Sequence, residues 1–223
     1  MVLNYNLECG HYKVVDHIIC KRKLYDCDGV FVYLPPYSPS EIKKLYSHYD
    51  GQSKLSSTSA RPVEQSKFIS ANVPNVSNMS IHEFGCAAAH LLIKLRNIYK
   101  PAYTICNDNA HYANRDTAII FNQEMSFDSV LTNSVDLFVS SHVVEHVSPD
   151  DWFPHLRRIV KPGGFVFTEV PNQRNDHFRK IVRGKYHVAF YNGTTFDATM
   201  RRSGFVGIAS SFKDTRWIHQ RKF

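Results

Sequence analysis

One stretch near the middle of this chain constrains its fold most strongly. Residues 78–92 read NMSIHEFGCAAAHLL, an apolar segment followed by a glycine and then by alanines and leucines. The pattern predicts a strand over Met79–Phe84, a tight turn at Gly85 and a helix over Ala87–Asn97. A glycine lets the backbone turn sharply and approach a ligand closely. The helix that follows presents free N–H groups and a positive dipole end, so this corner is typical of nucleotide-type binding.

Beyond this corner the chain alternates between expected strands and helices. A helix is expected to begin at Pro149, and KPGG (161–164) is expected to turn from it into a buried strand. A later helix, capped by Thr194 or Thr195, is expected to end at Gly204. Strands are predicted over Ala102–Cys106, Ala118–Phe121, Val135–Ser140, 165–170, 205–212 and 216–220. Strands that alternate with helices favour a parallel sheet, and 223 residues suffice for one α/β domain with an extension.

The first 50 residues are predicted to form a small N-terminal extension. It contains an expected strand over Val30–Leu34 and an expected helix capped by Ser38 or Ser40. Its cysteines and histidine could form a tetrahedral zinc site, but they lack paired C-x-x-C spacing, so ordinary thiols are the preferred interpretation. These four residues are Cys9, His11, Cys20 and Cys27.

Residues 51–77 are rich in serine, threonine, asparagine and glutamine, and we expect a linker or a partly helical connector there. Arg61 and Gln65 could reach a ligand from this connector, although no pattern requires it. Residues 78–223 are expected to form the main domain. Within it, residues 173–185 are basic and polar and are expected to lie over the carboxyl ends of the strands, where substrates bind in such sheets.

Composition and charge narrow the class of protein. The formal charge of +7 favours anionic partners, although a solvated basic surface is the simpler interpretation. We find no nucleic-acid-binding signature, so nucleic acid is a disfavoured partner. No apolar run of about 18 residues predicts a membrane helix, and the first residues lack the pattern of a secretory signal. Five scattered cysteines predict a cytoplasmic protein whose thiols are free or metal-bound.

From Ile81 to Gly204 the chain resembles class I S-adenosylmethionine-dependent methyltransferases. HEFGCAAAHLL resembles that family's acid-x-Gly-x-Gly-x-Gly loop, with Glu83 at the acid and Gly85 at the first glycine. SVDLFVSSHVVEHVSPDDWFPHLRRIVKPGGFVFTEVPN resembles the fourth-strand region, with its "EH", "KPGG" and "PN" elements, and HVAFYN and SGF resemble late elements. The resemblance implies a Rossmann-like α/β fold. It has a mostly parallel seven-stranded sheet with helices on both faces, here with the small N-terminal extension.

The resemblance also implies S-adenosylmethionine as cofactor and S-adenosylhomocysteine as product. Asp108 matches the residue that holds the ribose, with Asn107 as an alternative and helix capping as the alternative role of Asp108. Glu124 falls near the adenine, and Ser141 near the sulfonium. The implied cofactor-binding residues are Glu83, Phe84, Gly85, Cys86, Ala87, Asp108, Asn109, Glu124, Met125 and Ser141.

The loop departs from the family's pattern at two positions. Ala87 and Ala89 stand where the second and third glycines usually lie. Alanine is accommodated if these positions have helical torsions, but it is penalised if they need positive φ. A methyltransferase-like binding or scaffold domain without catalysis is therefore an alternative to an active enzyme.

Transfer to an oxygen usually needs a base that takes the hydroxyl proton, and histidine suits neutral pH. We favour His142 and His187, then His146, for which a structural role is the alternative; Asp176 and His177 are further candidates. A metal is a less favoured possibility. His142, Glu145 and His146 have i, i+3, i+4 spacing and, with His187, could bind a divalent cation. That set is similar to the Glu-x-x-Glu-His plus distant histidine of small-RNA 2′-O-methyltransferases, except at His142.

The sequence thus predicts a methyltransferase that acts on an oxygen of a small molecule by direct in-line transfer. A sugar, glycan or sugar nucleotide is the preferred acceptor, and the polar, basic segment 173–185 suits such a partner. An RNA methyltransferase is a less favoured alternative. The oligomeric state is left open.

Overall fold

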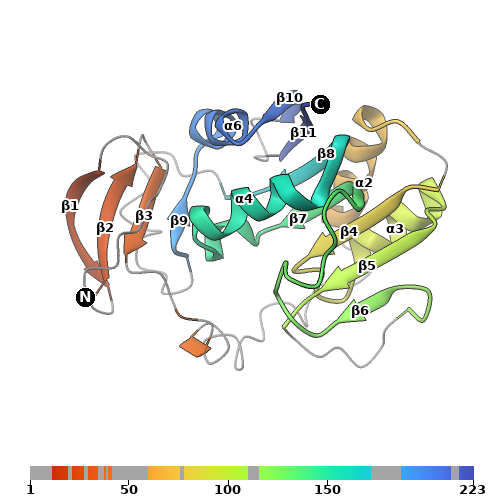
Figure 1. Cartoon of the computed structure of the whole chain (residues 1–223), viewed down its shortest axis with the longest axis horizontal. Helices are drawn as coiled ribbons and strands as arrows, with labels where there is room; N and C mark the ends of the chain where they lie inside the picture. The colour runs from red at the N-terminus through yellow and green to blue at the C-terminus, as the bar shows by residue number, and fades with distance from the viewer. Residues whose placement is uncertain are drawn as a thin grey trace.

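A seven-stranded sheet forms the centre of the molecule (Figure 1). A computed structural model of the chain describes residues 12–19, 22–27, 30–34, 38, 40–41, 60–75, 78–109, 116–171, 187–211 and 216–223. The strands of the central sheet are β4 (Ser80–Phe84), β5 (Tyr103–Asn107), β6 (Ile120–Asn122), β7 (Val135–Ser141), β8 (Val160–Glu169), β10 (Phe205–Ser211) and β11 (Arg216–Arg221). Their order is β10-β11-β8-β7-β4-β5-β6. The strands from β8 to β6 are parallel, and β11 and β10 are antiparallel to their neighbours.

Helices cover both faces of this sheet. Helices α2 (Ala60–Asn72) and α3 (His90–Tyr99) contact each other and pack on one face, while α4 (Pro149–Ile159) and α6 (Gly193–Arg202) pack on the other. Alternate residues of β7 enter the two cores, since Leu137 and Val139 lie with Leu92 and Ile69, whereas Phe138 lies with Trp152 and Phe196. This alternation explains why the parallel strands are apolar on both sides. The predicted Rossmann-like α/β architecture is confirmed.

A second sheet joins the N-terminal extension to the main domain. It contains β1 (Tyr12–Ile19), β2 (Arg22–Cys27), β3 (Val30–Leu34) and β9 (Ala189–Phe190) in that order, all antiparallel. Phe31 pairs with Phe190 and Val32 with Ala189, and the Val32 side chain is buried in the core beneath α4 and α6. The extension therefore pairs with the segment that follows His187. Cys9, His11 and Cys20 lie outside the described residues, as does the side chain of Cys27.

Of the two predicted helix caps, one is confirmed and one was wrong. Ser38 forms a capping box with Glu41, because each backbone N–H donates to the other's side chain at 2.8 and 3.3 Å, so the choice of Ser38 is confirmed. The choice of Thr194 or Thr195 as cap was wrong. Asn192 caps α6, and Thr195 is its partner in the capping box.

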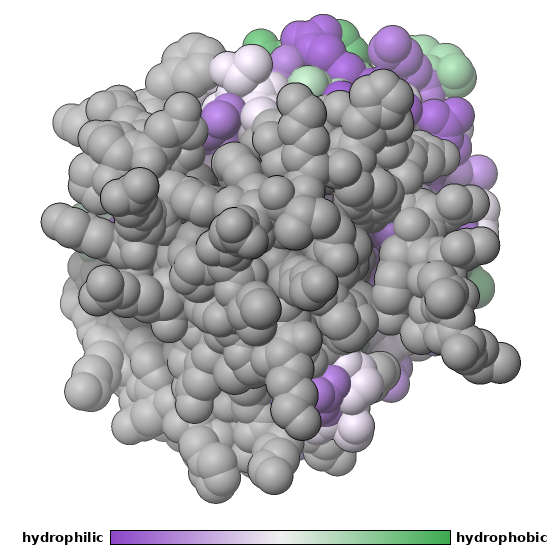
Figure 2. Space-filling view, turned by 90° about the vertical axis from the view of Figure 1, so that its left-hand side faces the viewer, coloured by the Kyte–Doolittle hydropathy of each residue, from purple (hydrophilic) through white to green (hydrophobic). Residues whose placement is uncertain are grey.

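KPGG (161–164) was expected to be a turn before the strand, but it belongs to β8 itself. Val135 of β7 pairs with Val160 of β8, whereas Leu137 pairs with Phe165. Strand β8 therefore has extra residues between these two pairs, and they form an irregularity within the strand. Among the described residues, no helix is long and apolar enough to cross a membrane. Where described residues reach the surface in Figure 2, along the upper margin, hydrophilic residues predominate.

Candidate active site

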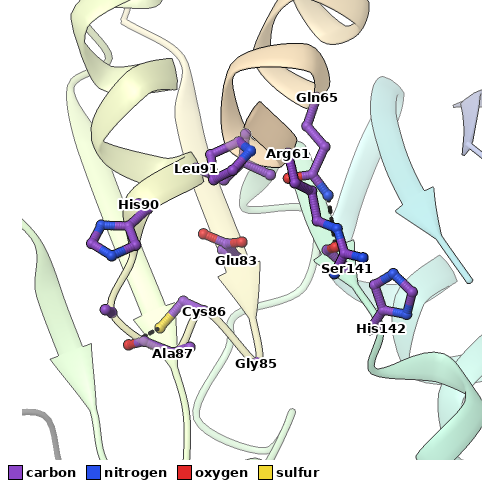
Figure 3. A pocket seen from close by; sticks show the side chains of 12 residues that line it. Arg61, Gln65, Glu83, Gly85, Cys86, Ala87, His90, Leu91, Ser141 and His142 are labelled. Atoms are coloured by element: carbon purple, nitrogen blue, oxygen red, sulfur yellow. Dashed lines mark hydrogen bonds between the residues drawn. The ribbon is translucent and has the colours of Figure 1, made fainter. Parts of the chain in front are cut away.

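A pocket opens where the ends of β4 and β7 meet the start of α3 and the first turns of α2 (Figure 3). Its empty space is about 530 Å³ when the part open to solvent is included. The residues that line it are Arg61, Pro62, Gln65, Glu83, Gly85, Cys86, Ala87, Ala88, His90, Leu91, Ser141 and His142. The pocket therefore combines the predicted glycine turn with two side chains from α2.

The loop after β4 has a glycine-like path. Gly85, Ala87 and Ala89 have φ values of 69°, 51° and 57°, so every second residue is left-handed. A Cβ at Gly85 would lie 2.2 Å from Cγ2 of Val143, which leaves room only for glycine. The alanines do not have the helical torsions that would accommodate them. Each left-handed alanine costs about 1–2 kcal/mol, so other contacts must hold this loop.

Two hydrogen bonds hold the loop in this shape. The Ala87 N–H donates to the Asp108 carboxylate at 2.7 Å, and the Ala89 N–H donates to the Cys86 carbonyl at 2.7 Å. Asp108 directly follows β5. Asp108, which was predicted to hold the ribose, thus also holds the loop that follows the neighbouring strand β4.

A disulfide also holds the loop. Cys86, in the loop, is bonded to Cys106 on β5, with their Cα atoms 5.8 Å apart. The expectation that the cysteines are free or metal-bound was therefore wrong for this pair. The separation in sequence hid the pairing, because only the parallel register of β4 and β5 brings the two residues together.

Glu83 lies at the base of the pocket and is 3% exposed. Burial, and then the neighbouring Asp108 carboxylate, raise its pKa to about 8, so the side chain is mostly protonated at neutral pH. Its Oε2 atom is buried and has no hydrogen-bond partner among the described residues. This carboxyl group is suited to a cationic ligand, which would restore its charge and give it a partner.

Glu169, at the end of β8, contacts several polar side chains on the other side of the pocket. Its carboxylate accepts from Gln65 Nε2 at 3.1 Å and from Arg216 Nε at 2.5 Å. Arg61 Nε lies 3.7 Å away, and Gln65 also donates to the Ser141 hydroxyl at 2.7 Å. Figure 3 shows Arg61 and Gln65 reaching from α2 toward Ser141. The two side chains named from the connector thus lie in the pocket, tied to the ends of β7 and β8.

His142 is held between two carboxylates. Its Nδ1 lies 3.3 Å from Glu145 Oε1 and its Nε2 lies 3.2 Å from Glu169 Oε1. Burial opposes the charged ring, but the hydrogen bonds to Glu145 and Glu169 prevail and raise the pKa of His142 to about 9. The ring is therefore protonated at neutral pH. Its backbone has φ 56°, an unfavourable conformation for a non-glycine residue of the kind found at functional sites.

Behind His142 lies a second group of side chains. One possible ligand atom from each of Glu145, His146 and His187 lies within 4.8 Å of the others. Glu145 Oε2 and His187 Nδ1 are buried without a hydrogen-bond partner among the described residues. Burial lowers the pKa of His187 to about 4, so this ring is neutral. A metal would have to draw these atoms closer, because ligand atoms opposite each other across a metal lie only about 4.2 Å apart at usual bond lengths.

The model of a family described as "Methyltransferase domain" matches residues 58–210, more than two thirds of the chain. The chain belongs to this family. It is an S-adenosylmethionine-dependent methyltransferase, and the predictions of family, cofactor and enzyme class are confirmed.

Solved structures share the fold of this methyltransferase. It is similar to the 1,6-didemethyltoxoflavin N1-methyltransferase of Burkholderia thailandensis, solved with 1,6-didemethyltoxoflavin and S-adenosylhomocysteine (TM-score 0.66; 11% identity; 95% of this chain and 100% of that chain covered). It is also similar to a protein bound to the Trm112 methyltransferase activator of Haloferax volcanii (TM-score 0.61; 13% identity; 73% and 90% covered). It is similar as well to a phosphoethanolamine N-methyltransferase of Haemonchus contortus, solved with S-adenosylhomocysteine (TM-score 0.54; 14% identity; 65% of this chain and 37% of that chain covered). No curated protein matches this chain.

The methyltransferase pocket fits the cofactor in three respects. Gly85 lines the pocket with bare backbone, which a ligand can approach closely. Glu83 offers an unpartnered buried oxygen, and Arg61 brings a cation to the same pocket. These charges complement the ammonium and carboxylate groups of a bound amino acid moiety.

The structure brings only some of the predicted site residues together. Glu83, Gly85, Cys86, Ala87, Ser141 and His142 line the pocket, and Asp108 contacts the loop. Phe84 does not line it but lies in the core, with its ring centroid 4.3 Å from that of Phe127. Asn109 and Met125 do not line the pocket, and the Asn109 side chain accepts a hydrogen bond from the Met125 N–H at 3.1 Å. Glu124 is exposed and does not line the pocket either. Asp176 and His177 lie outside the described residues.

Sequence reasoning missed Glu169 and Arg216. Glu169 lies inside the apolar strand FVFTEV, where its burial was expected but its four polar neighbours were not. An acid within a buried strand end is the signal that would have identified it, because buried carboxylates are rarely left unpaired.

Proposed function

We propose that this methyltransferase methylates an oxygen of a small polar molecule, such as a sugar, glycan or sugar nucleotide, by direct in-line transfer. The single observation that carries this proposal is the neutral, half-buried His187 beside Glu145, behind the pocket residue His142. A hydroxyl acceptor must lose its proton, whereas a neutral amine attacks through its lone pair. A neutral imidazole next to a carboxylate therefore favours an oxygen acceptor.

Residues of the loop would hold the cofactor. Glu83 would face its ammonium group, Arg61 its carboxylate, and Asp108 the ribose hydroxyls. The bound cofactor supplies an activated methyl group. The protein's task is then to align the acceptor with that group and to exclude water, which lowers the barrier through orientation.

His187 would accept the acceptor's proton. Its low pKa makes it a weak base, but a hydroxyl oxygen becomes strongly acidic as the new bond to carbon forms, so a weak base suffices late in the transfer. The Glu145 carboxylate would stabilise the resulting imidazolium, since its charge already raises the pKa of His187 against the effect of burial. His146, with its ring centroid 4.8 Å from that of His187, would keep the ring in place.

His142 has a different role in this proposal. Its protonated ring pairs with Glu145 and Glu169, so it cannot take a proton at neutral pH. It would orient Glu145 and present a cation at the wall between the pocket and His187. Small anionic acceptors, sugar nucleotides among them, suit this charge and that of Arg61.

A panel of sugars, glycans and sugar nucleotides tests the proposal, with methylated product detected by mass spectrometry. The His187→Asn variant should lose about 10²-fold or more in kcat while its affinity for S-adenosylhomocysteine stays unchanged. His155→Asn, which changes a histidine stacked on Phe127 outside the pocket, is the matched control and should retain activity. Full activity of His187→Asn would refute the assignment of the base. Activity lost on chelation and restored by a divalent cation would instead place a metal at Glu145, His146 and His187.

A domain that binds a ligand without catalysis is the second candidate. The left-handed alanines at positions 87 and 89 favour it, because they disfavour the loop shape that the cofactor needs. Absence of product with every acceptor, together with absence of S-adenosylhomocysteine binding, would support this candidate. We also propose a cytoplasmic location, an expectation from the scattered cysteines that the Cys86–Cys106 disulfide weakens.

A further inference from the structure

Two cysteines lie directly under the cofactor loop and take no part in the proposed methyl transfer. Cys86 is in the loop and lines the pocket, while Cys106 lies on β5, paired with Glu83 in the sheet register. The side chains are 5% and 0% exposed, and the Cα separation of 5.8 Å lies in the range that a disulfide spans. The backbone path seen here therefore suits the disulfide form of this pair.

The loop needs such a restraint. Ala87 and Ala89 both adopt left-handed conformations that alanine disfavours, where glycine would adopt them freely. The restraints from β5 and the residue after it are the Cys86–Cys106 bond and the hydrogen bonds from Gly85 N–H to the Asn107 carbonyl and from Ala87 N–H to Asp108. Without the covalent bond, the alanines can relax toward negative φ, and the loop leaves the path that accommodates a ligand.

We propose that the Cys86–Cys106 pair is a redox switch of cofactor binding. The disulfide keeps the loop in its glycine-like path, and the dithiol releases it. In the thiol form, Cys86 Sγ has an alternative partner, since it lies 3.8 Å from the Ala87 carbonyl oxygen and can donate an S–H hydrogen bond to it. The inference rests on the proposed place of the cofactor in this loop.

The chemistry is thiol–disulfide exchange. A low-molecular-weight disulfide such as oxidised glutathione is attacked by the Cys86 thiolate, which forms a mixed disulfide and releases one glutathione thiolate. The Cys106 thiolate then displaces the second glutathione and forms the internal S–S bond. Two electrons pass from the cysteine thiols to glutathione, and the two cysteine protons end on the two glutathione thiols. Disulfides in reducing compartments are usually of this transient, sensing kind.

The pocket links this exchange to the cofactor. Cys86 lines the pocket and is 5% exposed, so a cofactor bound there would lie against this residue. Because coupling is reciprocal, a cofactor that binds the disulfide form more tightly also stabilises the disulfide against reduction.

Calorimetric titration with S-adenosylhomocysteine tests the proposal on the full chain in two states. One sample is oxidised with oxidised glutathione and the other is reduced, with free thiols counted in each. Reduction should weaken binding about tenfold, which corresponds to about 1.4 kcal/mol. The Ala89→Gly variant, changed at a left-handed position outside the pocket lining, should lose less affinity on reduction than the wild type, because glycine needs no restraint there. Equal affinity in the two wild-type states would overturn the proposal.

Controls separate this switch from other effects. The Cys9→Ser/Cys20→Ser/Cys27→Ser variant retains only the proposed pair and should respond to reduction as the wild type does. Cys86→Ser/Cys106→Ser should bind weakly in both states, and circular dichroism establishes that it folds. If that variant does not fold, the wild-type comparison still decides. No binding in either wild-type state would refute the cofactor site itself, a result distinct from equal binding.

Discussion

Replacing Gly85 by alanine tests the close contact at the centre of the pocket. The new Cβ would lie 2.2 Å from Val143 Cγ2, where ordinary contacts begin at 3.4 Å, and the position keeps φ 69°. The left-handed backbone costs about 1–2 kcal/mol and forced overpacking about 1–3 kcal/mol. Gly85→Ala should therefore lower the free energy of unfolding by about 2–5 kcal/mol, a large part of the total for a domain.

Urea unfolding measures this loss, and two variants divide it into its causes. Gly163 has φ 78°, but its nearest neighbour is the exposed terminal ring of Phe223, which can move. Gly163→Ala should thus lose only the backbone contribution of about 1–2 kcal/mol. Gly85→Ala/Val143→Ala should recover the overpacking contribution through a coupling of about 1–3 kcal/mol. A loss for Gly85→Ala no larger than that for Gly163→Ala would refute the close-contact argument.

Three other changes probe the surrounding contacts. Asp108→Ala should weaken S-adenosylhomocysteine binding at least tenfold, as measured by calorimetry against the exposed control Asp128→Ala; unchanged affinity would remove Asp108 from the site. Glu169→Gln should lower the pKa of His142 from about 9, as followed by NMR titration. Since that folded-state value exceeds the unfolded 6.5, His142 stabilises the fold fully below about pH 6.5 and loses this effect as pH rises through about 9, a decline that should be smaller in the variant. Asn192→Ala should cost about 1 kcal/mol in thermal unfolding, because the Thr195 N–H loses its bond to the Asn192 side chain, and an unchanged Tm would contradict that role.

The periodic parts of the fold were predictable because the local pattern and the tertiary structure agree. The apolar run that became β7 and the stripe of α4, from Trp152 to Ile159, pack as their periodicity indicated. KPGG was misplaced because its glycines signal a turn locally, whereas pairing with β7 keeps the segment within β8. Asn192 was missed as a cap since Thr194 and Thr195 also favour that position.

The site was harder to predict because its properties arise from contacts between distant segments. Phe84 was expected in the pocket, but strand alternation turns it into the core. His142 is well placed for a base, yet Glu169, which is 27 residues away, helps to keep it protonated. The disulfide between Cys86 and Cys106 depends in the same way on the pairing of two parallel strands.

Binding of S-adenosylhomocysteine to the oxidised wild-type protein, measured by calorimetry, tests the central claim most directly. We predict that S-adenosylhomocysteine binds at one site per chain with a dissociation constant in the micromolar range. This binding should be lost in Gly85→Ala molecules that remain folded. Absence of binding in both the oxidised and the reduced protein would contradict the assignment of this pocket to the cofactor.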